Sequence, residues 1–72
     1  MNKVKIDTET IKLDSFLKWC AAASSGAEAK IYIKNGMVKV NNEICTMRGK
    51  KLIAGDVVSL DNEEYEVVCL LK

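Results

Sequence analysis

The sequence predicts a small α+β domain in which two short helices pack on an antiparallel, curled β-sheet. Two observations support this class: apolar residues recur at helical spacing between residues 13 and 36, and at alternate positions in much of the remainder. The chain has 72 residues, which is the size of one small domain. We therefore expect residues 1–72 to form a single domain.

The first helix is predicted from Leu13, Phe16, Leu17 and Cys20, which fall at i, i+3, i+4 and i+7. It should begin near residue 14 or 15 and run to about residue 22 or 23.

The second helix is predicted from its ends. The stretch from Ser25 to Glu28 has the form of a capping box, in which each of these two side chains can bond a backbone amide of the first turn. Gly36 lies where a left-handed residue ends many helices. Lys30 and Lys34, four residues apart, should share one face between these ends.

The rest of the chain is predicted to be β. A short N-terminal strand is expected at residues 4–6, and four strands at residues 37–40, 43–46, 57–60 and 65–69. Turns are expected at Asn41–Asn42, where Asn tolerates a positive φ, and at residues 54–56 and 61–62.

Charge is strongly segregated although the net charge is only +1. Residues 30–51 hold six cations, Lys39 among them, and the single acid Glu43, whereas residues 52–72 hold Lys72 and five acids. A segregated charge of this kind predicts a cationic surface suited to a nucleic acid.

Cofactor and metal chemistry is not expected. The chain has no histidine, and its three cysteines, at positions 20, 45 and 69, have no paired metal-ligand spacing. We expect the three cysteines to be buried, reduced thiols, and metal or redox chemistry of the three cysteines is the alternative. Without a signal peptide or a long apolar run, the sequence predicts a cytoplasmic protein. The lack of histidine, the lack of a Gly-rich phosphate loop of a recognised kind and the small size of the chain predict that it is not an enzyme.

A family resemblance appears once these elements are in order. Lys12-Leu13-Asp14 with Leu17, then Ala23-Ser24-Ser25, Ala29-Lys30 and Ile33, then Gly36 to Asn41, and finally Gly55-Asp56 with Val58, resemble the S4 RNA-binding domain, also called the alpha-L RNA-binding motif. The similar core covers about residues 12–60, with flanking strands at both ends. Within the family, the chain resembles a branch of very short, free-standing bacterial proteins.

The resemblance implies a non-catalytic RNA-binding protein. Its expected partner is ribosomal RNA, then transfer RNA, and it is expected to act as a monomer that meets ribosomal particles. One departure matters: many family members carry an arginine directly after the serine that caps the second helix, and here that position is Gly26.

The candidate RNA-binding residues combine cations with a helix N-terminus, where free amides attract anions. They are Lys12, Ser25, Gly26, Lys30, Lys34, Arg48, Lys50 and Lys51. The alternative for each is structural: a solvated helix face, a helix cap or a solvated turn. Trp19 and Tyr32 could stack on bases, but the favoured interpretation is that they pack partly into the core or cover its edge. The alternative function is a protein-interaction module acting in ribosome assembly.

Overall fold

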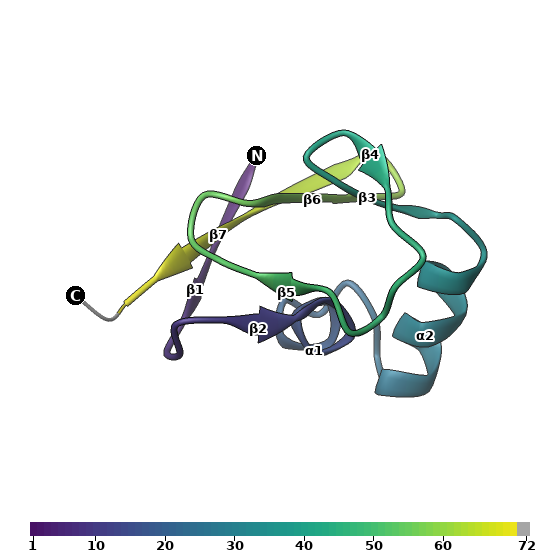
Figure 1. Ribbon diagram of the computed structural model, residues 1–72, viewed down its shortest axis with the longest axis horizontal. Coiled ribbons are helices and arrows are strands. Elements are labelled where there is room, and N and C mark those ends of the chain that lie inside the picture. Colours follow the sequence, from purple (N-terminus) through teal and green to yellow (C-terminus); the bar gives the residue numbers. More distant parts are fainter. Residues whose placement is uncertain (71–72) are drawn as a thin grey trace.

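The computed structural model describes residues 1–70 of the chain. Its elements in order are β1 (Asn2–Ile6), β2 (Ile11–Lys12), α1 (Leu13–Trp19), α2 (Gly26–Lys34), β3 (Val38–Val40), β4 (Glu43–Ile44), β5 (Lys51–Leu52), β6 (Val57–Leu60) and β7 (Glu63–Cys69). The predicted class, two short helices with a mostly antiparallel sheet, is confirmed (Figure 1).

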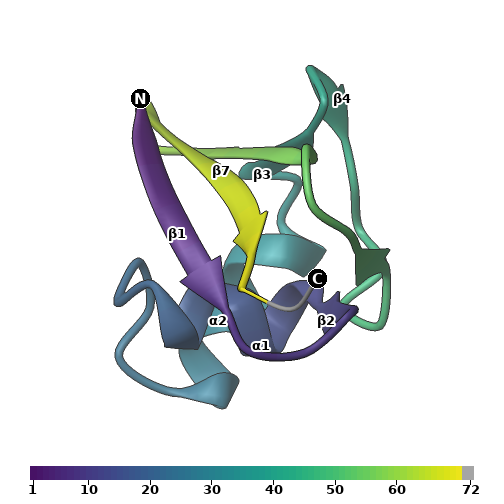
Figure 2. The same cartoon turned by 90° about the vertical axis from the view of Figure 1, so that its left-hand side faces the viewer.

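Five strands form one open sheet in the order β1-β7-β6-β3-β4. β7 has different partners along its length, because residues 63–66 pair with β6 and residues 65–69 pair with β1. Figure 2 shows β1 and β7 turning down from the level of β3 and β6, so the sheet curls around the helices.

The core fills the space inside this curl. Phe16, Leu17 and Ile33 bring the apolar faces of α1 and α2 to it and are fully buried. The sheet and the β2–β5 pair supply other buried side chains, among them Ile6, Val38, Leu52, Val58 and Val67. Burial of apolar area at about 25 cal/mol per Å² is the main force that holds helices and sheet together.

Two features of the sheets differ from the prediction. β1 runs parallel to β7, whereas an antiparallel sheet was expected. In addition, β2 and β5 form a separate two-stranded antiparallel ladder. A strand of two residues has too few positions to show an alternating pattern, so this ladder is invisible in the sequence.

α1 ends earlier than predicted, at Trp19. Ala21 has a φ of 63°, a left-handed conformation that stops the helix. The Ala21 amide donates to the Lys18 carbonyl at 3.2 Å and closes the last turn. The alanines that follow are good helix formers, which is why the sequence pattern runs on past this point.

The N-terminus of α2 has the predicted cap. The Glu28 amide donates to the Ser25 Oγ at 3.1 Å, and the Glu28 Oε1 accepts from the Ser24 amide at 2.9 Å. The return bond thus reaches one residue further than the usual capping box.

The C-terminus of α2 ends at a left-handed glycine, as predicted. Gly36 has a φ of 73°, and its amide donates to the Ile33 carbonyl at 3.1 Å. The Met37 amide donates to the Tyr32 carbonyl at 3.1 Å. These two bonds make a Schellman motif, which turns the chain sharply into β3.

Both two-residue hairpin turns use residues with positive φ. The values are 52° and 70° at Asn41 and Asn42, and 55° and 67° at Asp61 and Asn62, as type I′ turns require. Asn41 also has a structural role through its side chain, which accepts from the Val57 amide at 2.9 Å and donates to Asp56 at 3.1 Å.

Among residues 1–70, neither helix has the length and apolar character needed to cross a membrane.

Candidate nucleic-acid interface

The loop before β5 is held against the start of α1 by backbone hydrogen bonds. The Leu13 amide donates to the Lys50 carbonyl at 2.8 Å, and the Asp14 amide donates to the Arg48 carbonyl at 3.1 Å. No side chain caps α1, so these loop carbonyls satisfy amides that would otherwise lack a partner. These two hydrogen bonds to the first turn of α1 therefore fix the position of the loop.

The β2–β5 ladder continues this attachment. Ile11 pairs with Leu52, and Lys12 pairs with Lys51. Lys12, Arg48, Lys50 and Lys51, far apart in sequence, thus lie together at one corner of the molecule, and all four are exposed. We call these four residues the basic corner.

The loop before β5 is a hydrogen-bonded β-turn whose tip is exposed. The Lys50 amide donates to the Met47 carbonyl at 3.1 Å, which places Arg48 and Gly49 at the two central positions of the turn. A Cβ added at Gly49 would meet no atom within 4 Å. The backbone at this position is therefore accessible from outside, as close approach of a phosphate requires.

One half-buried carboxylate, Asp14, lies beside the basic corner, because its backbone amide is bonded to the Arg48 carbonyl. Its Oδ1 accepts from the Ser15 amide at 2.7 Å. No side chain of the basic corner donates any of the side-chain hydrogen bonds formed within residues 1–70. The cationic groups are therefore available to an outside ligand.

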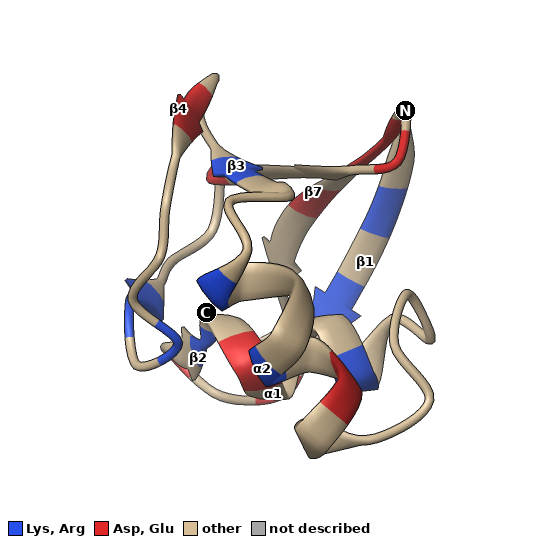
Figure 3. Cartoon of the chain, turned by 90° about the vertical axis from the view of Figure 1, so that its right-hand side faces the viewer, with Lys and Arg blue, Asp and Glu red and all other residues tan. Residues whose placement is uncertain are grey.

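The lysines of α2 lie beside this corner. Lys34 is exposed in the last turn, and Lys30 is half-buried one turn earlier. In Figure 3 the blue segments at the C-terminal end of α2, in β2 and in the loop before β5 lie on one side of the molecule. The acidic turn between β6 and β7 lies apart from them, next to the N-terminus.

Ser25 and Gly26 lie at the other end of α2, about 13 Å along the helix axis from Lys34. The Ser25 hydroxyl is engaged as the helix cap. The Ser24 amide that donates to Glu28 lowers the pKa of this carboxyl, so a negative charge sits in the first turn. Of the predicted surface, this end is the least suited to a phosphate.

Lys39 does not join the other cations of the middle third. It lies in a shallow groove on the sheet with Asp61, Glu63 and Glu64, because β3 pairs with β6 and places Lys39 opposite Ser59. The expectation that all six cations of residues 30–51 share one surface is wrong for this residue.

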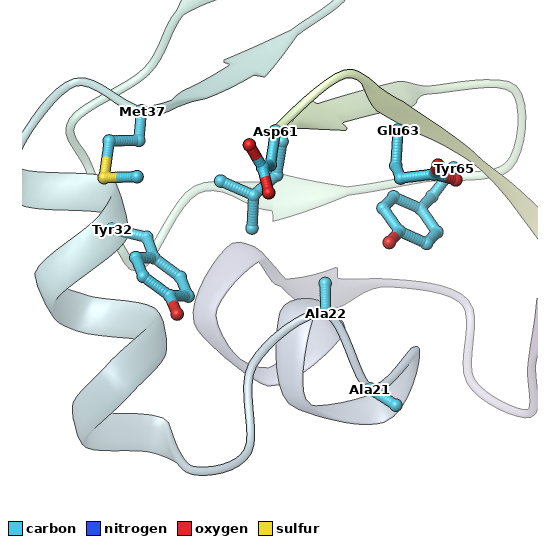
Figure 4. Close-up of a pocket in the computed structure, with 8 residues that line it drawn as sticks. Ala21, Ala22, Tyr32, Met37, Asp61, Glu63 and Tyr65 are labelled. Carbon is cyan, nitrogen blue, oxygen red and sulfur yellow. The ribbon is translucent and has the colours of Figure 1, made fainter.

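A second cleft, of about 280 Å³, is acidic and aromatic. Tyr32, Tyr65, Asp61 and Glu63 line it, and Figure 4 shows Tyr32 on α2 and the other three on the β6–β7 hairpin, above Ala21 and Ala22. Burial is the main cause that raises the pKa of both Tyr32 and Tyr65, and neighbouring carboxylates add to it. The carboxylates of this cleft disfavour the binding of a polyanion. The face that carries the cleft and the face that carries the basic corner therefore differ in charge.

Trp19 lies at the end of α1 and is joined to β1. Its side chain is 54% exposed, and its Nε1 donates to the Lys5 carbonyl of β1 at 2.8 Å. This hydrogen bond fixes the ring at the surface, outside the buried core. The sequence contains a signal for this exposure, because Ser15, Lys18 and Trp19 lie at helical spacing outside the apolar stripe of α1.

The chain is similar to known proteins over most of its length. The family model of the S4 domain matches residues 4–68. A protein of Bacillus subtilis (strain 168) named "Probable ribosome maturation protein RlbA" is 43% identical over 60 residues, which are 83% of this chain and 84% of that protein. A protein of Escherichia coli (strain K12) named "Putative RNA-binding protein YbcJ" is 38% identical over 58 residues, 81% of this chain and 83% of its own length.

Solved structures agree. The solution structure of YbcJ from E. coli, described as an alfaL motif involved in RNA-binding, has a TM-score of 0.72 at 33% identity and covers 94% of this chain and 87% of its own. The 30S ribosomal protein S4e of Thermoplasma acidophilum has a TM-score of 0.70 at 21% identity, over 83% of this chain and 32% of its own, which supports the fold alone. The chain therefore belongs to the S4 domain family, whose alpha-L motif is an RNA-binding fold.

Proposed function

We propose that this protein binds a structured RNA on the basic corner and on Lys30 and Lys34 of α2. Ribosomal RNA is the first candidate for this RNA and transfer RNA the second. The single observation that carries the proposal is the placement of Lys12 directly opposite Lys51, in a ladder joined to the loop that carries Arg48 and Lys50. Like charges placed opposite each other destabilise a fold. An anionic ligand is the natural reason for such an arrangement.

The chemistry suits the backbone of an RNA helix. A-form helices are recognised mostly through shape and through phosphate and 2′-hydroxyl contacts. Arg48 can bind phosphate oxygens through two parallel hydrogen bonds, whereas the lysines act as point charges. The exposed backbone at Gly49 adds room for a close phosphate.

The relatives support the same direction, since one is named for ribosome maturation and another for RNA binding. We propose that the protein acts in the cytoplasm as one monomeric domain of residues 1–72, in contact with ribosomal particles. It needs no cofactor and catalyses no reaction in this scheme.

The test is a charge-reversal comparison. Lys30→Glu with Arg48→Glu should abolish tight binding of ribosomal RNA fragments, measured by filter binding or fluorescence anisotropy. The matched control is Lys3→Glu with Lys39→Glu, because both lysines are exposed and lie on β1 and β3, outside the basic corner. Equal loss of affinity in both double variants would contradict the proposal.

A second candidate function is a protein-interaction module in ribosome assembly. The acidic cleft favours it, because Met37 is 47% exposed and lines the cleft with the two tyrosines. The affinity for a basic protein segment that binds in this cleft should fall in a variant with Tyr65→Ala and Asp61→Asn. The Arg48→Glu variant should bind this segment as the unchanged protein does.

A further inference from the structure

Trp19 has the properties of a fixed, exposed stacking surface. It is the only tryptophan of the chain, and 54% of it is exposed at the end of α1. The hydrogen bond from its Nε1 to the Lys5 carbonyl, at 2.8 Å, already uses its one polar atom. The ring therefore offers an outside ligand its apolar face, and the loss of side-chain freedom on binding is small.

A shallow cleft of about 440 Å³ opens beside the ring. It is lined by Ile11, Ser15, Lys18 and Trp19, which supply an apolar wall, a hydroxyl, an ammonium and an aromatic face. This combination matches the parts of a nucleotide: a flat base, polar base edges and a phosphate.

One wall of the cleft, Ile11, lies next to the basic corner. Ile11 is the neighbour of Lys12 in β2 and pairs with Leu52 of β5. From Lys12 to Trp19 the chain rises about 10 Å along α1. A ligand that lies on the basic corner can therefore reach the indole without leaving the surface of the same helix.

We propose that Trp19 stacks on one unpaired base of the bound RNA, while Ser15 hydrogen-bonds to that nucleotide and Lys18 meets its phosphate. This inference rests on the proposed function and narrows it: the preferred RNA is a helix with an unpaired nucleotide beside it. The helix lies on the basic corner, and the unpaired base leaves it to reach the cleft. An apolar protein segment is the competing occupant, but the cations within and beside the cleft favour a nucleotide.

The test compares three RNAs that share one duplex: fully paired, with a single-nucleotide bulge, and with the bulge as an abasic site. The bulged RNA should quench the fluorescence of Trp19 and bind more tightly than the other two. Removal of one stacking partner costs about 5- to 150-fold in affinity. Trp19→Ala should lose that advantage while it binds the paired duplex as the unchanged protein does.

Trp19→Phe is the second variant, since it keeps an aromatic face without the Nε1 donor and should retain part of the preference. A fluorescent base analogue at the bulge reports stacking in both variants independently of tryptophan. Salt-dependent binding of all three RNAs with equal affinity and no change in Trp19 fluorescence would overturn the stacking inference and leave RNA binding intact. No binding of any RNA would overturn both, and quenching by an apolar peptide but not by RNA would assign the cleft to a protein.

Discussion

Lys12 and Lys51 are direct cross-strand partners in the β2–β5 ladder. Side chains opposite each other in an antiparallel pair have their Cβ atoms about 4.5–5.5 Å apart, so two ammonium groups share one small area of surface. The pairing is fixed by its surroundings, because Leu52 is fully buried and the Lys50 carbonyl is bonded to α1. The fold thus holds a repulsive pair in place.

Replacement of one partner should separate stability from binding. Lys51→Thr removes the repulsion and places a β-branched residue in the ladder, so we expect the unfolding free energy to rise by about 0.2–1 kcal/mol. RNA affinity should fall at the same time, because one cation is lost. Chemical denaturation and fluorescence anisotropy measure the two effects. Lys39→Thr, which changes a lysine of β3, is the control and should leave RNA affinity unchanged.

Gly26 offers a gain of function. A Cβ added there meets no atom within 4 Å, and the family resemblance implies that many relatives carry an arginine at this position. Gly26→Arg should therefore fold normally and tighten RNA binding severalfold at low salt. The gain should disappear in high salt, since it is electrostatic. An unchanged affinity would mean that the first turn of α2 lies outside the RNA-binding surface.

Ala21 is a site of backbone strain. Its φ of 63° is costly for a residue with a Cβ, and glycine adopts it freely. Ala21→Gly should raise the unfolding free energy by about 1 kcal/mol, measured by thermal or denaturant unfolding. Ala27→Gly, at an exposed position within α2, is the matched change and should lower it by a similar amount. Destabilisation by both would rule out strain at Ala21.

Glu28 gives the fold a defined acid dependence. Its pKa is lowered below the ordinary value of 4.5, because the charged form accepts from the Ser24 amide. A lowered folded-state pKa contributes stability above the unfolded value, and this contribution is lost as the pH falls through the folded value. Glu28→Gln can still accept the bond but cannot titrate, so the variant should lose less stability below pH 4.5 than the unchanged protein. Identical acid unfolding curves would contradict this role.

Most of the fold could be predicted because its signals are local. The capping serine, the left-handed Gly36 and the Asn-Asn turn each act within a few residues, and each was found where the pattern placed it. The direction of β1 beside β7 could not be predicted, because alternation identifies a strand but carries no information about its partner.

The candidate site divides in the same way. The cations could be identified from composition, but the grouping of Lys12 with the loop 48–51 depends on two backbone bonds to α1 and on a two-residue ladder. The separation of Lys39 depends on its register against β6. Such contacts between distant segments leave no periodic trace in the sequence.

The salt dependence of RNA binding tests the central claim most directly. With about five phosphates neutralised, the plot of log affinity against log salt should have a slope of roughly −3 to −5. In a variant with Lys12→Ala, Arg48→Ala and Lys50→Ala the slope should become shallower by about 2 to 3, whereas Lys3→Ala with Lys39→Ala should leave it unchanged. A slope that is the same in all three proteins would contradict the basic corner as the RNA-binding surface.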